Sequence, residues 1–244
     1  MKTTKLSGNE QNVVNLEALI AVIRTFGPAY NPSKSWLTIQ GLSELLEKGK
    51  YETNAANIAE VIYNNALSAR SMAFDGFDGL ITRSINALRI LGVPAQTLTQ
   101  AEALVRELRG KRASALLTDE ELAAAKAEGN NAKQVVRHNS TIKSRLENMG
   151  KYILLLESIP DYKPNETELA TSALRAKMED LKTKHAQVVV SETTFDAARL
   201  SRDTLLNADI TGLVYNAKNA KTYIKSVFGA TSAQYKQVSG IKFK

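Results

Sequence analysis

Apolar residues recur at helical spacing over long stretches of this chain, and few residues interrupt the pattern. One stripe repeats every seven residues, as expected for one face of a long helix: Leu174, Leu181, Val188 and Phe195. A second stripe lies in the first half of the chain: Leu42, Leu45, Ile58, Ile62, Ala69, Ala73, Leu80 and Leu91. Each stripe predicts a long amphipathic helix with a coiled-coil-like packing seam.

The residues that break helices are concentrated in two similar segments. Four of the 5 prolines lie in Pro28–Leu37 and Pro160–Leu169, which share the pattern P-x-Y-x-P-[SN]-x-[ST]-x-L. Proline ends a helix, and it holds the residue before it in an extended conformation. Each segment therefore predicts a corner between a shorter helix and a long one.

Within each predicted corner, two positions suggest how it is held. Ser33 and Asn165 are favoured N-cap residues, and Glu168 completes a capping box in the second corner. We expect Tyr30 and Tyr162 to pack each corner against the bundle. The alternative is a tyrosine-lined ligand site that occurs twice.

The two segments are 132 residues apart, and other residues match at the same offset. The matched pairs are Leu37 with Leu169, Leu42 with Leu174, Tyr63 with Phe195, and Arg70 with Arg202. An ordered series of this kind indicates an internal duplication. We therefore divide the chain into a first helical repeat with a helical linker (1–132) and a second repeat (133–244), packed as one bundle domain.

Each repeat is predicted to hold a helix of ordinary length followed by a very long one. The shorter helices cover 9–26 and 134–158. The long ones are expected to break near Asp75–Gly79 and Asp209–Gly212, where glycine interrupts them. Between the repeats, Thr97–Leu108 and a segment starting at Thr118 are predicted helices. The predicted fold is all-α, an elongated antiparallel bundle with two long helices and internal pseudo-twofold duplication.

The net charge of +7 is unevenly distributed between the predicted repeats. Residues 1–132 hold 14 basic and 14 acidic side chains, whereas residues 133–244 hold 18 and 11. Lys218, Lys221 and Lys225 share one helix face near the C-terminus, among several aromatic residues. They could form a phosphate-binding surface. The simpler interpretation is that the lysines complement the helix dipole while the aromatic residues belong to the core. A second basic cluster contains Arg106, Arg109, Lys111 and Arg112.

Motifs for familiar enzyme chemistry are absent from the sequence. There is no cysteine, no HExxH or ExxH metal motif, no glycine-rich phosphate loop and no GxSxG. The two histidines, His138 and His185, stand outside any such motif. The segment Asp75–Gly79 (DGFDG) lacks the further oxygen ligands of a calcium loop. We predict a non-enzymatic protein with no cofactor, no metal and no catalytic residues.

No apolar run reaches the length that a membrane span requires, and the N-terminus is a poor signal peptide. With no cysteine as well, we expect a cytoplasmic protein that does not act at a membrane.

Two segments of the second repeat, Tyr162–Leu169 and Tyr223–Phe243, carry a resemblance to a known family. The chain resembles a family of uncharacterised all-helical repeat proteins from flavobacteria and their relatives. The resemblance implies a helical bundle, and it implies no activity and no site residues.

Three functions are compatible with these features. The first is a structural or scaffolding protein that binds another protein or itself. The second is a nucleic-acid-associated protein that uses Lys218, Lys221 and Lys225. The third is a helical pore-forming protein, ranked last because Ala113–Leu117 is too short for an insertion segment. We favour the first.

Overall fold

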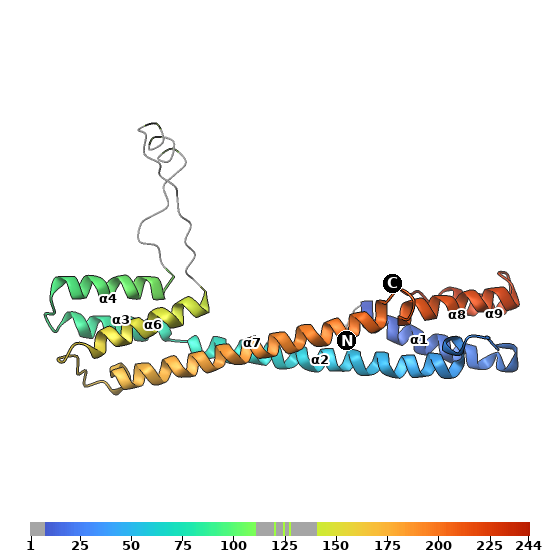
Figure 1. Ribbon diagram of the computed structural model, residues 1–244, viewed down its shortest axis with the longest axis horizontal. Coiled ribbons are helices and arrows are strands. Elements are labelled where there is room, and N and C mark those ends of the chain that lie inside the picture. The colour runs from blue at the N-terminus through green and yellow to red at the C-terminus, as the bar shows by residue number, and fades with distance from the viewer. Residues whose placement is uncertain (1–7, 111–119, 121–123, 125–126, 128–140) are drawn as a thin grey trace, which may run out of the picture. The chain divides into compact units, whose positions relative to one another are not determined.

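The computed structural model of the protein describes residues 8–110, 120, 124, 127 and 141–244 (Figure 1). All regular structure in this part of the chain is helical, which confirms the all-α prediction. The α-helices with described bounds are α1 (Gly8–Thr25), α2 (Ile39–Phe74), α3 (Phe77–Arg89), α4 (Ala95–Leu108), α6 (Ile142–Glu157), α7 (Thr171–Asn207), α8 (Leu213–Phe228) and α9 (Ala233–Ser239). Three short 3₁₀ helices are η1 (Gly27–Ala29), η2 (Ser35–Leu37) and η3 (Thr167–Leu169).

The chain forms two compact units, and each of them takes residues from both predicted repeats. Unit 1 contains Met1–Asn65 and Val190–Lys244, and unit 2 contains Ala66–Val189. The predicted boundary at residue 132 lies outside the described residues. This boundary does not separate the compact units, because α2 and α7 each contribute one part to unit 1 and the other part to unit 2.

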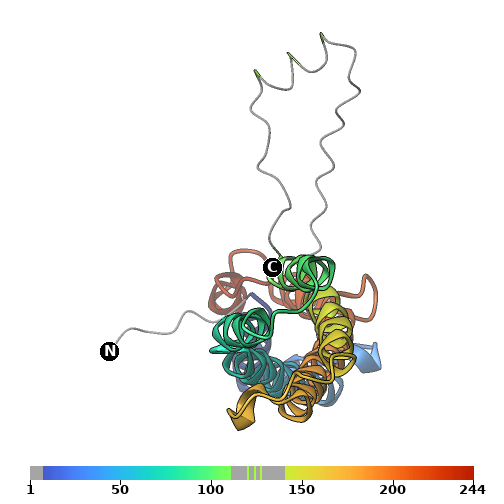
Figure 2. The same ribbon diagram turned by 90° about the vertical axis from the view of Figure 1, so that its left-hand side faces the viewer.

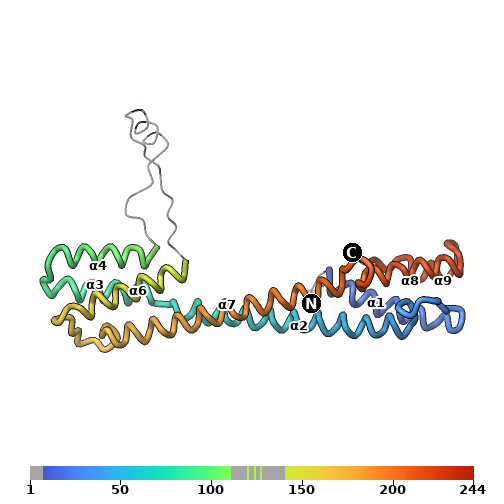
Figure 3. Tube along the Cα trace, in the orientation of Figure 1, coloured from blue at the N-terminus to red at the C-terminus, as the bar shows by residue number. Residues whose placement is uncertain are grey.

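The two long helices are uninterrupted over 36 residues in α2 and 37 residues in α7 (Figure 3). Both end where glycine was expected to break them. After Phe74, Gly76 adopts a left-handed conformation with φ of 71°, and α3 begins at the next residue. Similarly, α7 ends at Asn207 and α8 begins after Gly212.

The two proline-containing corners have the same internal geometry. Tyr30 is buried, and its hydroxyl donates a hydrogen bond to the carbonyl of Leu37 at 2.7 Å. Tyr162 is buried in the same way and donates to the carbonyl of Leu169 at 3.1 Å. Both leucines are buried, which confirms the predicted packing of the corners.

The start of the long helices differs from the sequence prediction. A 3₁₀ turn separates Ser33 and Asn165 from the helices, so neither residue is the N-cap. In the first corner Thr38 has this role, because its Oγ1 accepts from the amide of Gly41 at 3.1 Å. Glu168 is not part of a capping box. Its carboxylate pairs with Arg83 instead.

The core of unit 1 is built around α1 and α8, which contact each other. It includes buried residues of α1, of the first turns of α2 and of α8: Leu16, Ile23, Leu42, Leu46, Leu213 and Ile224. The C-terminal residues Val238 and Phe243 close it. In addition, the side-chain amide of Asn12 exchanges hydrogen bonds with the backbone of Lys244, at 2.8 and 3.1 Å.

The core of unit 2 lies among α3, α4, α6 and the first part of α7 (Figure 2). In the end-on view these helices surround the core, and α4 contacts both α3 and α6. Buried side chains from each helix meet there: Phe77, Ile81, Leu88, Val105, Leu108, Met149, Tyr152, Leu174 and Leu181.

The predicted stripes agree only partly with the observed burial. Leu174, Leu181 and Val188 of α7 are buried, and Phe195 is half-buried. In α2, however, Ile58 and Ile62 are more than half exposed. No helix among the described residues combines the length and the apolar character needed to cross a bilayer.

Candidate functional site

The three lysines of the predicted basic surface have different surroundings in α8. Lys221 turns into unit 1, where its ammonium group donates to the carbonyls of Ser239 and Ile241 at 3.1 and 2.5 Å. Burial lowers the pKa of this ammonium group. Lys225 lies 5.8 Å from the ring centre of Tyr235, and Lys218 is exposed. Because Lys221 is engaged with the end of α9, only two of the three are placed to contact a ligand.

The aromatic residues near these lysines mostly belong to the core of unit 1. Tyr223 packs edge-on against Tyr30, with ring centres 5.3 Å apart, and Phe228 contacts Phe26 at the same separation. This agrees with the simpler interpretation of the C-terminal region. Tyr215 is the exception, because it is 39% exposed.

The charge asymmetry between the predicted repeats is absent from the compact units. Unit 1 contains 14 basic and 10 acidic residues, a net charge of +4. Unit 2 contains 18 and 15, a net charge of +3. The excess of basic residues in the second repeat is therefore shared between the two units.

A concave site of unit 1 lies at its corner, and we call it the unit 1 corner pocket. Its volume is about 600 Å³. The lining combines η2, the first turns of α2 and the loop before α8: Ser35, Trp36, Thr38, Gln40, Gly41, Glu44, Leu45, Lys48, Ile210, Thr211 and Asn216.

Two large apolar side chains of the lining are exposed, and a third exposed side chain lies beside one of them. Trp36, the single tryptophan, is 40% exposed, and Ile210 is 73% exposed. The ring of Tyr215 lies beside Trp36, with ring centres 6.4 Å apart. We call Trp36, Ile210 and Tyr215 the aromatic patch. Aromatic residues exposed together are typical of protein-binding surfaces.

The backbone brings the patch together through a close helix approach. A Cβ at Gly41 would lie 2.4 Å from the carbonyl oxygen of Ser35, so only glycine lets η2 pack this closely on α2. At the base of the pocket, Asn216 is buried and donates to the carbonyl of Thr211 at 3.0 Å. Its side-chain carbonyl oxygen has no hydrogen-bond partner.

Unit 2 has a pocket of about 460 Å³ at its own corner, lined in part by residues 132 positions from those of unit 1. Here Glu168 stands at the position of Trp36, 132 residues further along the chain. Glu168 and Arg83 form an ion pair. The same place in the corner is therefore apolar and aromatic in unit 1 and charged in unit 2.

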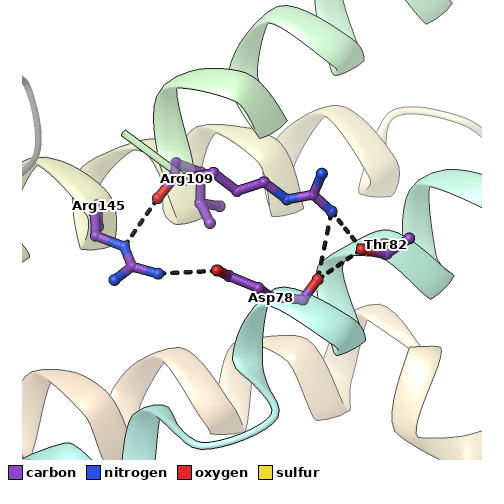
Figure 4. Close-up of polar contacts among 5 residues, drawn as sticks. Asp78, Thr82, Arg109 and Arg145 are labelled. Atoms are coloured by element: carbon purple, nitrogen blue, oxygen red, sulfur yellow. Dashed lines mark hydrogen bonds and ion pairs between the residues drawn. The ribbon is translucent and has the colours of Figure 1, made fainter. Parts of the chain in front are cut away.

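A polar cluster in unit 2 joins the ends of three helices (Figure 4). From α6, Arg145 donates to the carbonyl of Leu108 at 2.9 Å and pairs with the carboxylate of Asp78 at 3.0 Å. From the end of α4, Arg109 donates to the Asp78 carbonyl at 3.3 Å and to the hydroxyl of Thr82. Because these bonds join α3, α4 and α6, the cluster stabilises unit 2. One polar atom of the cluster, the buried Nε of Arg109, has no hydrogen-bond partner.

The remaining candidate residues of the sequence are distributed through the fold. His185 is half-buried in α7, with its Nδ1 3.4 Å from Arg70. Of the DGFDG segment, Asp78 is paired with Arg145 as described. His138, Lys111, Arg112, Thr118 and Ala113–Leu117 lie outside the described residues. Within the described ranges, no group of three or more His, Asp or Glu side chains is arranged to hold a metal ion.

The aromatic patch was not predicted from the sequence, although the sequence contains a signal for it. At the offset of 132, the only tryptophan is matched with a glutamate. A comparison of the repeats for differences, rather than for similarities, would have identified this position. Comparison of the chain with models of protein families, with curated proteins and with solved structures gives no match.

Proposed function

We propose that this protein is a non-enzymatic structural protein that self-associates through the aromatic patch of unit 1. The supporting observation is that Trp36 and Ile210 are exposed in the lining of one pocket, with the exposed ring of Tyr215 beside Trp36. Tryptophan and tyrosine are the residue types that most often dominate binding energy in protein interfaces. The corner of unit 2 has the same geometry with charged side chains, so folding alone does not require this patch to be aromatic.

The charges beside the patch favour a second copy of the chain as the partner. Glu44 and Lys48 are both exposed on α2, one helical turn apart, and both line the corner pocket. Glu44 accepts from Gln40 at 2.9 Å. In a twofold interface the same surface meets itself, so Glu44 of one copy can face Lys48 of the other, and the reverse. A surface with one acid and one base in this arrangement is self-complementary.

Light scattering coupled to size-exclusion chromatography, at low and at high salt, tests self-association. We expect an oligomer that persists at high salt, because the patch is mainly apolar. The double variant Trp36→Glu with Tyr215→Arg replaces both aromatic side chains of the patch with charged ones and should elute as a single chain. Glu168→Gln, which changes the matched corner of unit 2, is the control and should leave the oligomer intact. A wild-type protein that is monomeric at both salt concentrations contradicts the proposal.

Charge reversal tests the twofold geometry. Lys48→Glu alone and Glu44→Lys alone each place like charges across the interface, so each should weaken the oligomer. The combined Glu44→Lys, Lys48→Glu variant restores opposite charges and should restore association. Additive weakening in the combined variant would show that these two residues do not face each other.

We also propose that the chain is an elongated antiparallel bundle that arose by internal duplication with pseudo-twofold symmetry. Three observations support the duplication. The helices α2 and α7 begin 132 residues apart, as do η2 and η3. The two corner hydrogen bonds are equivalent. Tyr63 and Phe195, which match each other in sequence, stack with ring centres 6.0 Å apart, as a pseudo-twofold arrangement predicts. Small-angle X-ray scattering tests the elongated shape.

Nucleic-acid association through α8 is the weaker alternative, because Lys221 already binds carbonyl groups of its own unit. If it occurs, binding should weaken steeply with salt, and reversal of Lys218 and Lys225 to glutamate should abolish it.

We propose a cytoplasmic location as an expectation from composition. We also propose membership of the flavobacterial family of helical repeat proteins, carried by Tyr162–Leu169 and Tyr223–Phe243.

A further inference from the structure

A second concave surface lies in unit 2, between α6 and α7, and we call it the α6–α7 groove. Its volume is about 470 Å³. The floor is apolar, formed by the buried side chains of Leu146 and Met178 together with Gly150. Leu154, at one end, is 60% exposed. The other lining residues are Lys143, Glu147, Lys151, Lys182, His185 and Ala186.

The groove is open because α6 has a glycine at its centre. The buried residues of α1 and α6 match at an offset of 133, which pairs Leu16 with Met149 and Glu17 with Gly150. In unit 1, Glu17 reaches from α1 to Lys50 of α2, with a separation of 2.7 Å. Lys182 occupies the position of Lys50 in unit 2, but Gly150 offers it no side chain. The bridge of unit 1 is therefore missing at this position of unit 2, where α6 and α7 are joined instead beyond the groove, by Glu157 and Arg175 at 2.7 Å.

The rim of the groove is mainly basic. Lys143 and Lys151 stand on α6, and Lys182 stands on α7, so there are positive charges on both sides of the apolar floor. Lys182 also contacts Glu179 of its own helix at 2.9 Å. The one acidic residue of the lining is Glu147. A ligand that fits this surface has an apolar face with negative charges on both flanks.

We propose that the α6–α7 groove binds an acidic amphipathic helix of a partner protein. A helix with leucine-type residues on one face would place them over Leu146, Gly150 and Met178, while its glutamates and aspartates meet the three lysines. The lining extends along α6 from Lys143 to Leu154, which is roughly 16 Å at 1.5 Å per residue. This distance corresponds to three turns of a bound helix.

A labelled synthetic peptide is the probe for this proposal. It has about 18 residues, or five turns of helix, with leucine at helical spacing on one face and glutamate elsewhere. The matched control peptide has the same leucines, with lysine in place of every glutamate. Fluorescence anisotropy should show binding of the acidic peptide to the full chain and much weaker binding of the basic one.

Two variants locate the binding in the groove. Gly150→Glu supplies the side chain that unit 1 has at this position and should weaken binding of the acidic peptide about tenfold or more. A Cβ at Gly150 would lie 3.6 Å from the sulfur of Met178, an ordinary contact, so this variant should fold. The pair Lys143→Glu, Lys151→Glu should abolish acidic-peptide binding and promote binding of the basic peptide. Reversal of Lys218 and Lys225 in unit 1 changes the charge equally and should leave binding within about twofold.

Several results would overturn the proposal: no binding of the acidic peptide, equal binding of the basic peptide, or unchanged binding to a folded Gly150→Glu variant. Binding of decanoate in the groove without binding of the peptide would show that the occupant is a small amphiphilic acid. Self-association at the aromatic patch of unit 1 is measured separately by light scattering. Failure of either experiment therefore leaves the other proposal standing.

Discussion

In both units a tyrosine closes the corner before a long helix, and in both it donates to the carbonyl of a leucine seven residues later. Around this shared contact the chemistry differs. Trp36 of unit 1 lies beside Tyr215, whereas Glu168, at the matched position of unit 2, forms an ion pair with Arg83. The backbone therefore accepts either kind of pair at the same place. Where the two units differ although packing permits both solutions, a role other than folding is the natural explanation.

Between the paired helices of each unit the difference is the opposite one, because here unit 1 has the ion pair. Glu17 and Lys50 join α1 to α2 in unit 1, whereas Gly150 leaves Lys182 without such a partner on α6. Unit 1 thus has an ion pair at this position and is apolar at its corner. Unit 2 has the α6–α7 groove at this position and is charged at its corner. The two surfaces that we propose as partner sites are therefore of different types.

The largest expected effect comes from the matched core leucines. Leu42→Ala and Leu174→Ala each remove a fully buried side chain and should lower the free energy of unfolding by about 2–5 kcal/mol. Since Trp36 is the only tryptophan, its fluorescence reports on unit 1 alone, whereas circular dichroism reports on both units. We expect Leu42→Ala to shift the denaturation curve of Trp36 and Leu174→Ala to leave it unchanged. Equal shifts in both variants would mean that the units unfold together.

The next largest expected effect is a loss of stability at high pH. Burial raises the pKa of Tyr162 from 10.0 to about 12, and burial also raises the pKa of Tyr30 and of Tyr152. Because the unfolded chain releases these protons first, stability is complete below pH 10 and falls as the pH rises from 10 towards 12. For Tyr162 the loss is on the order of 2 kcal/mol. Absorbance at the tyrosinate band should show three groups that titrate above the ordinary pKa of tyrosine, and Tyr162→Phe should remove one of them.

Removal of the tyrosine hydroxyl from each corner should have a smaller effect on stability, and it compares the same hydrogen bond in the two units. Tyr30→Phe and Tyr162→Phe each remove one hydroxyl from a buried bond, so each should cost about 1–2 kcal/mol. Chemical denaturation followed by circular dichroism measures both. A large difference between the two variants would show that the corners are alike in geometry but unequal in energy.

The smallest effect is expected at the charged corner of unit 2. Arg83 and Glu168 are each more than half exposed, so their ion pair is well solvated. Replacement of both by alanine should change the free energy of unfolding by less than about 1 kcal/mol. A thermal melt of the double variant beside the wild type tests this. A clear loss of stability would mean that this pair, unlike most surface pairs, holds its corner together.

Local features of the fold could be predicted from the sequence, whereas long-range features could not. The corners and the helix breaks follow from proline, tyrosine and glycine acting on their own neighbours. The 3₁₀ turn at Ser35–Leu37 was missed because Ser33 is an equally good N-cap candidate in sequence terms. Periodicity also placed Ile58 and Ile62 in the core, although they are exposed, because spacing identifies a helix face but not what covers it.

The candidate site was harder to predict than the fold. Sequence spacing grouped Lys218, Lys221 and Lys225, and it could not show that Lys221 is directed to the carbonyls beyond α9. The sequence also did not show which segments make up each unit, because α2 and α7 each contribute residues to both units. Trp36 and Ile210, which line one pocket, are far apart in the chain, and only the folded structure brings them together.

The bonds between Asn12 and Lys244 have a consequence for the order in which the chain acquires its structure on the ribosome. Unit 2 is one continuous segment, so it can fold as soon as Val189 has emerged. Unit 1 is interrupted by the 124 residues Ala66–Val189. At about 5–20 residues per second, the first segment of unit 1, which ends at Asn65, waits roughly 6–25 s for the first residue of the second segment. During that interval the nascent chain exposes Leu16, Leu19 and Ile23, which makes α1 the segment most in need of a chaperone.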